Sequence, residues 1–138
     1  MVTQTAPIAL ASDSQRVFNE WIQNVRQLCR DVHTWSEEQG WQVVEGQIEI
    51  REEPFGIYTL PELTLTLPEG KVLLKPVGRQ IYGAEGRVDL YSYPAWDEVH
   101  LMRVQGKWVP RIALGLTWPI EWSQACFVDL VQRLIAEP

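Results

Sequence analysis

The spacing at which apolar residues recur changes twice along this chain, and this change restricts the fold more than any other feature. From Ser12 to Trp35 apolar residues recur at three- and four-residue steps, which predicts one long amphipathic helix. From Trp41 to Leu114 the period falls to two, the spacing of half-buried strands. A helical period returns after Thr117. The order helix, strands, helix predicts an α+β fold.

The first helix has clear start and stop signals. Ser12 and Gln15 have the spacing of a capping box, and Gly40 suits the left-handed position that ends a helix. Residues 1–11 show no period, so we expect an N-terminal arm followed by one domain over residues 12–138. The predicted buried stripe consists of Val17, Phe18, Trp21, Ile22, Val25, Leu28, Cys29, Val32 and Trp35.

Alternation and turn residues predict about six strands. Pro68-Glu69-Gly70 and Gln105-Gly106-Lys107 are short enough to join neighbouring strands, so we expect an antiparallel sheet in meander order. Pro110 lacks the N–H that a central strand needs, which places the last strand at an edge or at a bulge. The predicted strands are 41–51, 63–67, 72–75, 87–93, 99–104 and 108–114, the first with its apolar face on Val44, Gly46, Ile48 and Ile50.

The final helix is expected to begin at Thr117-Trp118-Pro119, because proline is tolerated in a first helical turn. Its apolar arc, which includes Trp122, Cys126, Phe127, Leu130, Val131, Leu134 and Ile135, is wider than half a turn. Such an arc fits a helix packed on the sheet and against the first helix, or a helix that also forms a homodimer interface. Both interpretations stay open on the sequence alone.

Charge and cysteine content narrow the class of protein. The 138-residue chain carries a net charge of −6, which argues against nucleic-acid binding, since that depends on a basic surface. The stretch from Arg79 to Arg111 nevertheless holds five basic and four acidic residues, so an anionic partner would bind there. Cys29 and Cys126 are interpreted as buried free thiols. No signal peptide or membrane-spanning run is visible, and a cytoplasmic protein is expected.

One face of the predicted sheet has the composition of a binding patch. Alternation places one arginine, one aspartate and two tyrosines of strand 87–93 on the same side, next to a histidine of the following strand and a loop tryptophan. Amphipathic aromatics mixed with arginine combine contact area with directed hydrogen bonds. The alternative is the ordinary polar face of a one-sided sheet. The predicted binding residues are Arg87, Asp89, Tyr91, Tyr93, Trp96 and His100.

The same strands hold a second pattern. Gly86-Arg87-Val88-Asp89-Leu90 followed by Glu98-Val99-His100 resembles the metal-binding core of restriction-endonuclease-like nucleases, where Asp and Glu-x-Lys on adjacent strands hold a divalent cation. That resemblance implies a metal-dependent hydrolase using Asp89 and Glu98. His100 replaces the family's lysine, a strand rather than a helix follows, and the acidic chain suits DNA poorly. Alternatively, the two carboxylates are solvated or pair with Arg87 and Arg103.

Other catalytic patterns are missing from the sequence. There is no nucleophile elbow, no phosphate-binding glycine loop and no helical His-Glu-x-x-His, and only two histidines are present. We therefore expect a non-enzymatic binding protein without a cofactor, such as an adaptor, an immunity-type inhibitor or a chaperone. Its sheet face or a sheet–helix crevice would hold another protein or a small ligand. The Trp118-Pro119-Ile120-Glu121-Trp122 run is interpreted either as a packed helix entry or as an exposed partner anchor.

Overall fold

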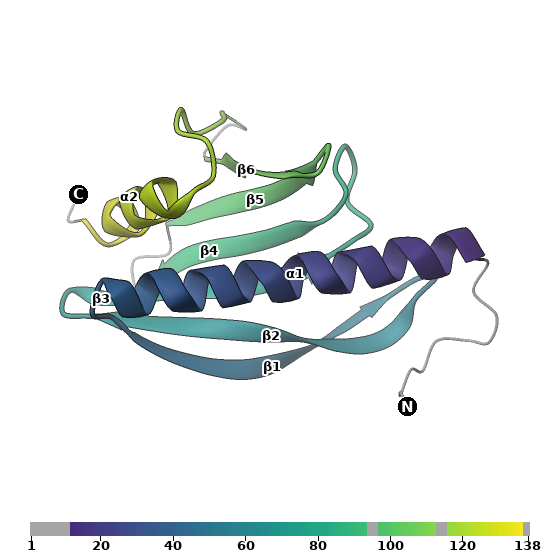
Figure 1. Cartoon of the computed structure of the whole chain (residues 1–138), viewed down its shortest axis with the longest axis horizontal. Coiled ribbons are helices and arrows are strands. Elements are labelled where there is room, and N and C mark those ends of the chain that lie inside the picture. Colours follow the sequence, from purple (N-terminus) through teal and green to yellow (C-terminus); the bar gives the residue numbers. More distant parts are fainter. Residues whose placement is uncertain (1–11, 94–96, 113–115, 137–138) are drawn as a thin grey trace.

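The structure is a computed structural model that describes residues 12–93, 97–112 and 116–136, so the predicted arm at 1–11 lies outside the described residues. It has a helix, six strands and a second helix in chain order, which confirms the predicted α+β fold (Figure 1). The elements are α1 (Ser12–Glu38), β1 (Gln42–Glu52), β2 (Gly56–Leu67), β3 (Gly70–Gly78), β4 (Arg87–Tyr93), β5 (Glu98–Val104), β6 (Lys107–Arg111) and α2 (Gln124–Ile135).

All six strands form one antiparallel sheet in the order β1-β2-β3-β4-β5-β6, as the short connections predict. The edges are therefore β1 and β6, and the edge position of Pro110 is confirmed. Both helices pack on the same face of the sheet, α1 over β1 and β2 and α2 over β3 and β4. Neither described helix combines the length and the hydropathy of a membrane span.

The core lies between this sheet face and the two helices. Alternate strand residues such as Leu63, Leu74 and Leu90 are fully buried there, each contributing roughly 1.5–3 kcal/mol by leaving water. Along α2, Phe127 lies 5.8 Å from Trp35 of α1 and 5.9 Å from Trp41, measured between ring centroids. The wide apolar arc of α2 thus contacts both the sheet and α1. A homodimer through this helix stays a prediction.

The predicted start of the second helix is wrong. Thr117 pairs with Arg111 at the edge of the sheet, and the N–H of Trp118 donates to the carbonyl of Pro110 at 2.9 Å. Because these backbone groups extend the sheet edge, they cannot also begin a helix. The helix starts only at Gln124, after Ser123, whose side chain accepts from the N–H of Cys126 at 3.2 Å.

The predicted buried face of β1 is only half correct. Ile50 is buried as expected, but Val44 is 63% exposed and its neighbour Val43 packs against the core instead. The reason lies in the partner strand β2, where Leu60 and Pro61 are buried in succession and the buried face changes parity. A single strand's alternation cannot reveal a parity change that its partner imposes.

A polar anchor joins α1 to the sheet near the start of the helix. Trp21 Nε1 donates to the hydroxyl of Tyr58 at 3.0 Å, and that hydroxyl donates to Glu52. The backbone N–H groups of Arg79 and Gln80 also donate to the Glu52 carboxylate, each at 2.9 Å. Burial and the neighbouring carboxylate raise the pKa of Tyr58. The anchor therefore ties α1, the β1–β2 hairpin and the β3–β4 connection together.

Gly86 is required by close packing against this anchor. Its φ is +135°, and a Cβ at this position would lie 2.2 Å from the Trp21 ring. Gly83 also has a positive φ, of +79°, but a Cβ there would meet nothing within 4 Å.

We predict that Gly83→Ala costs about 1 kcal/mol of unfolding free energy, and Gly86→Ala about 3 kcal/mol or more. Chemical denaturation measures both, and equal losses would contradict the packing argument.

The two buried thiols make the stability of the protein depend on pH. Cys29 and Cys126 are buried and free, and burial raises their pKa from 9.0 to about 12 and about 11. As the pH rises, these thiols ionise in the unfolded chain at a lower pH than in the folded protein. Ionisation therefore favours the unfolded chain, and the unfolding free energy should fall as the pH rises above 9. We expect a shallower fall for Cys29→Ala, measured by denaturation at several pH values. A disulfide reagent at pH 8 should label neither thiol until the protein unfolds.

Candidate functional site

The face of the sheet that carries neither helix is called the outer face here. In β4, Val88 and Leu90 are buried beneath the helices, so the residues between them project to the outer face. His100 pairs directly with Asp89 across the β4–β5 ladder and lies on the same face. Five of the six predicted binding residues therefore share the outer face, namely Arg87, Asp89, Tyr91, Tyr93 and His100. Trp96 lies outside the described residues.

Arg87 and Asp89 form a two-pronged ion pair at the centre of this face. Arg87 Nε donates to Asp89 Oδ1 at 2.7 Å, and Nη2 donates to Oδ2 at 2.9 Å. The Asp89 side chain is only 14% exposed. Hydrogen bonding to Asp89 raises the pKa of Arg87, although desolvation opposes this. The parallel geometry holds the guanidinium in one orientation, which prepares it to meet a partner without further loss of side-chain freedom.

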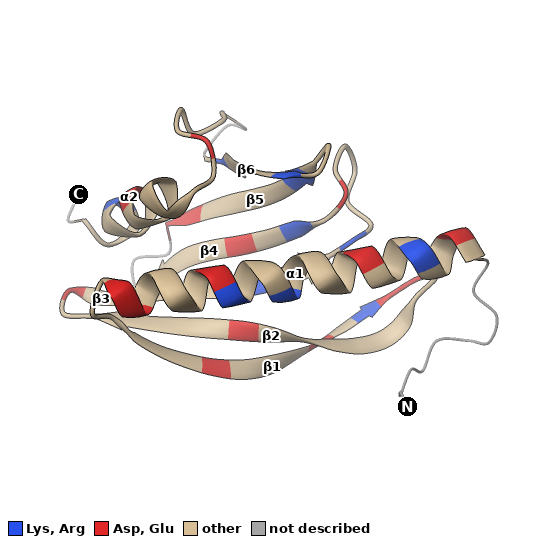
Figure 2. Cartoon of the chain, in the orientation of Figure 1, with Lys and Arg blue, Asp and Glu red and all other residues tan. Residues whose placement is uncertain are grey.

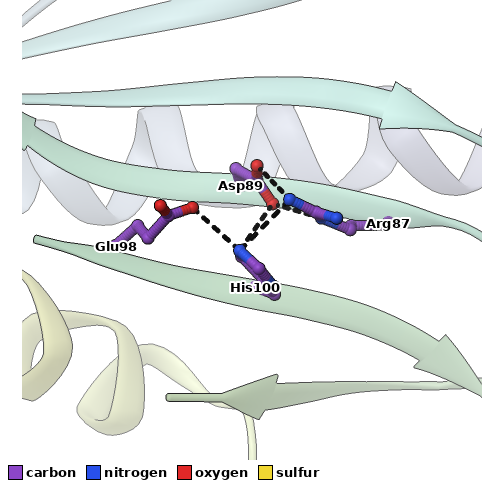
Figure 3. Close-up of polar contacts among 4 residues, drawn as sticks. All are labelled: Arg87, Asp89, Glu98 and His100. Atoms are coloured by element: carbon purple, nitrogen blue, oxygen red, sulfur yellow. Dashed lines mark hydrogen bonds and ion pairs between the residues drawn. The ribbon is translucent and has the colours of Figure 1, made fainter. Parts of the chain in front are cut away.

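His100 and Glu98 complete the cluster from β5 (Figure 3). His100 Nε2 lies 2.8 Å from Glu98 Oε1 and 3.1 Å from Arg87 Nη2. One ring nitrogen cannot donate to a carboxylate and accept from a guanidinium at the same time. With a proton on Nε2, His100 donates to Glu98; without that proton, the ring accepts from Arg87. The protonation or tautomeric state of His100 therefore decides which neighbour it binds.

The cluster belongs to a charged row that crosses the sheet. Lys75 of β3 pairs with Asp89, Asp89 with His100, and His100 with Arg111 of β6. On the other side, Lys75 Nζ lies 3.9 Å from Glu62 Oε2 of β2. Glu62, Lys75 and Arg111 were not predicted from the sequence as site residues. Each lies at an outward position of its own strand, but only the strand register shows that they are neighbours.

The outer face over β3 to β6 is more basic than the chain as a whole. Acidic positions outnumber basic ones along α1 and β1, and β2 carries Glu62 (Figure 2). Over the described outward positions of β3 to β6, five basic side chains face two acidic ones, whereas the whole chain has a net charge of −6. The basic residues are Lys71, Lys75, Arg87, Lys107 and Arg111, and the acidic ones are Asp89 and Glu98.

The structure also brings together the atoms that a metal site needs. One ligand atom from each of Asp89, Glu98 and His100 lies within 4.8 Å of the other two. Two carboxylates and an imidazole suit a divalent transition metal. However, the Arg87 guanidinium contacts both Asp89 oxygens and Nε2 of His100, so a cation there would meet a fixed positive charge.

The alternative to a metal site was that Asp89 and Glu98 are solvated or pair with Arg87 and Arg103. The structure shows one of these pairs. Asp89 pairs with Arg87, as that interpretation expects. Arg103 does not join them, because it lies on the helix side of β5, 5.0 Å from the centre of the Trp108 ring and 3.4 Å from Asn24 of α1. The register places Arg103 opposite Trp108, and these two positions alternate with those of the outer face.

A separate cleft of about 540 Å³ lies beside β6. Its walls include Trp108 of β6 and Trp118 and Trp122 of the segment before α2. Trp122 is half-buried against Trp35, at 5.7 Å between ring centroids, while Ile120 is 41% exposed. The Trp118–Trp122 run thus both packs on the core and lines a cleft. The sequence predicted a possible partner anchor at this run, but it did not predict that Arg103 and Trp108 lie beside it, because only the fold brings them together.

No protein-family model matches the chain, and no curated protein or solved structure shows significant similarity to it. Function therefore has to be inferred from the side chains and their arrangement.

Proposed function

We propose that the outer face of β3 to β6 binds an acidic surface of another protein. The observation that carries this proposal is the excess of basic side chains there, on a chain that is acidic overall. Complementary charge of this kind speeds association and selects the partner. Nucleic acid is negative along its whole length, so the acidic rest of the chain would repel it more than a local acidic patch on another protein, which favours a protein partner.

Two tyrosines that lie among these charged residues also support the proposal, because they provide contact area. Tyr93 is 51% exposed, and Tyr91 lies beside it on the same strand face with Lys75 6.0 Å from its ring centre. Tyrosine is enriched at protein interfaces because its ring provides apolar area and its hydroxyl can bond. The Arg87–Asp89 pair supplies a pre-oriented guanidinium next to this area.

The proposed role is that of an adaptor, inhibitor or chaperone rather than an enzyme. It requires no cofactor, because the outer face would act through charge and shape alone. We further propose a cytoplasmic location. Two buried free thiols support it, since such thiols persist in a reducing compartment.

Site-directed crosslinking in cells of the source organism tests the surface. A photoreactive phenylalanine analogue at Tyr93 should capture one discrete protein, while the same group at Gln27, on the exposed side of α1, should not. Lys71→Glu with Lys107→Glu should weaken that capture at least tenfold, because two attractive charges become repulsive. Arg16→Glu with Arg30→Glu changes the net charge equally on α1 and is the matched control. Identical products from both positions, or equal effects of both charge reversals, would refute the proposal.

A second candidate function is a divalent-metal hydrolase, favoured by the proximity of Asp89, Glu98 and His100. Here the two carboxylates and the imidazole would bind the cation, and bound water would become the attacking group. Arg87 would have to leave Asp89 for the metal to enter.

Calorimetric titration with Mn²⁺ and Zn²⁺ separates the two functions. With Arg87 in place we expect no saturable binding that depends on Asp89, because the guanidinium already occupies that carboxylate. Asp13, an exposed carboxylate on α1, provides the control variant Asp13→Asn. Saturable binding that Asp89→Asn abolishes and Asp13→Asn preserves would favour the hydrolase instead.

A further inference from the structure

The cleft beside β6 has the size and the wall chemistry of a small-molecule site. Its volume of about 540 Å³ falls within the range of about 300–1,000 Å³ typical of such sites. It lies between the edge strand β6 and residues 117–122, which precede α2. Its walls include Arg103, Lys107, Trp108, Trp118, Ile120 and Trp122.

The aromatic walls are held in place by contacts outside the cleft. Trp118 Nε1 donates to Asp129 Oδ2 of α2 at 3.1 Å. Trp122 packs against Phe127, with ring centroids 6.0 Å apart, and Trp108 packs against Trp21 of α1 at 6.4 Å. Because the rings are already fixed, a flat apolar ligand could bind between them with little further loss of side-chain freedom.

Arg103 gives the cleft an under-satisfied positive charge. Its Nε is buried and no described residue accepts a hydrogen bond from it, while Nη2 reaches only Asn24 at 3.4 Å. Neither Arg103 nor Lys107 forms an ion pair with a described residue. Burial lowers the pKa of Arg103, although the more distant Glu85 opposes the shift. A partly buried guanidinium with so few acceptors is stabilised by an anionic ligand.

We propose that this cleft binds a small carboxylate with a flat apolar body. The carboxylate would meet Arg103, with Lys107 adding positive charge, and the apolar body would lie against the tryptophan walls. Glu121 also lines the cleft and is exposed, so it disfavours an anionic group at its own position and helps to orient the ligand. This site shares Lys107 with the outer face, but its main ionic and aromatic groups, Arg103 and Trp108, lie on the opposite side of the sheet.

The test uses 2-naphthoate and its neutral counterpart 2-naphthamide, which differ at the carboxylate. Calorimetry on the whole protein should show at least tenfold tighter binding of 2-naphthoate. In ¹H–¹⁵N spectra, the indole signals of Trp108, Trp118 and Trp122 should shift on titration, while that of Trp41, which does not line this cleft, should shift much less. Equal affinity for the two compounds, or a shift at Trp41 as large as those of the three cleft indoles, would overturn the proposal.

Two variants that each remove one positive charge test whether Arg103 contacts the carboxylate of the ligand. Arg103→Gln should weaken 2-naphthoate binding at least tenfold and leave 2-naphthamide binding unchanged. Arg51→Gln removes one positive charge at β1, the opposite edge of the sheet, and should change neither affinity. If Arg103→Gln unfolds, the exposed Lys107→Gln replaces it, with a smaller loss expected. Equal effects of the Arg51 and cleft variants would show that net charge alone governs binding and would refute the site.

Discussion

The structure depends on one constraint: the six-stranded meander must bury one face, and both helices bury the same one. Alternate residues over most of each central strand, Leu63, Leu74, Leu90 and Leu101 among them, are buried on the face that α1 and α2 cover. Since successive side chains point to opposite sides of a strand, burying one set exposes the other. The outer face, with its charged row and tyrosines, is therefore a direct consequence of how the core forms.

The register of that sheet determines which charges become neighbours. Asp89 contacts Arg87 along its own strand, and faces Lys75 and His100 on the two adjoining strands. A shift of one residue in either ladder would send the partner side chains into the core. The same packing that buries Val88 and Leu90 thus holds the ionic cluster in place. Stability and the proposed recognition surface share a single structural origin.

The two proposed sites differ in character and share only Lys107 of the edge strand β6 among the residues proposed to bind. The outer face offers charge spread over several strands, which suits another protein. The cleft beside β6 offers aromatic walls and Arg103, which suits a small anionic ligand. Both use the last strands, β5 and β6, whose residues alternate between them: His100 and Arg111 face outward, while Arg103 and Trp108 face the helix side.

Local patterns in the sequence determined the type of each element and their order. A 3.6-residue period predicted α1, alternation and short turns predicted the meander, and alternation within β4 placed Arg87, Asp89, Tyr91 and Tyr93 on one face. These features depend on residues that are close in the chain, so they are readable before folding. Only the tertiary structure decided that Val43 replaces Val44 in the core, that Trp118 extends the sheet edge, and that Glu62, Lys75 and Arg111 join Asp89 in a row. Each of these depends on a partner strand that is distant in sequence, and the pairing of two strands cannot be read from either one alone.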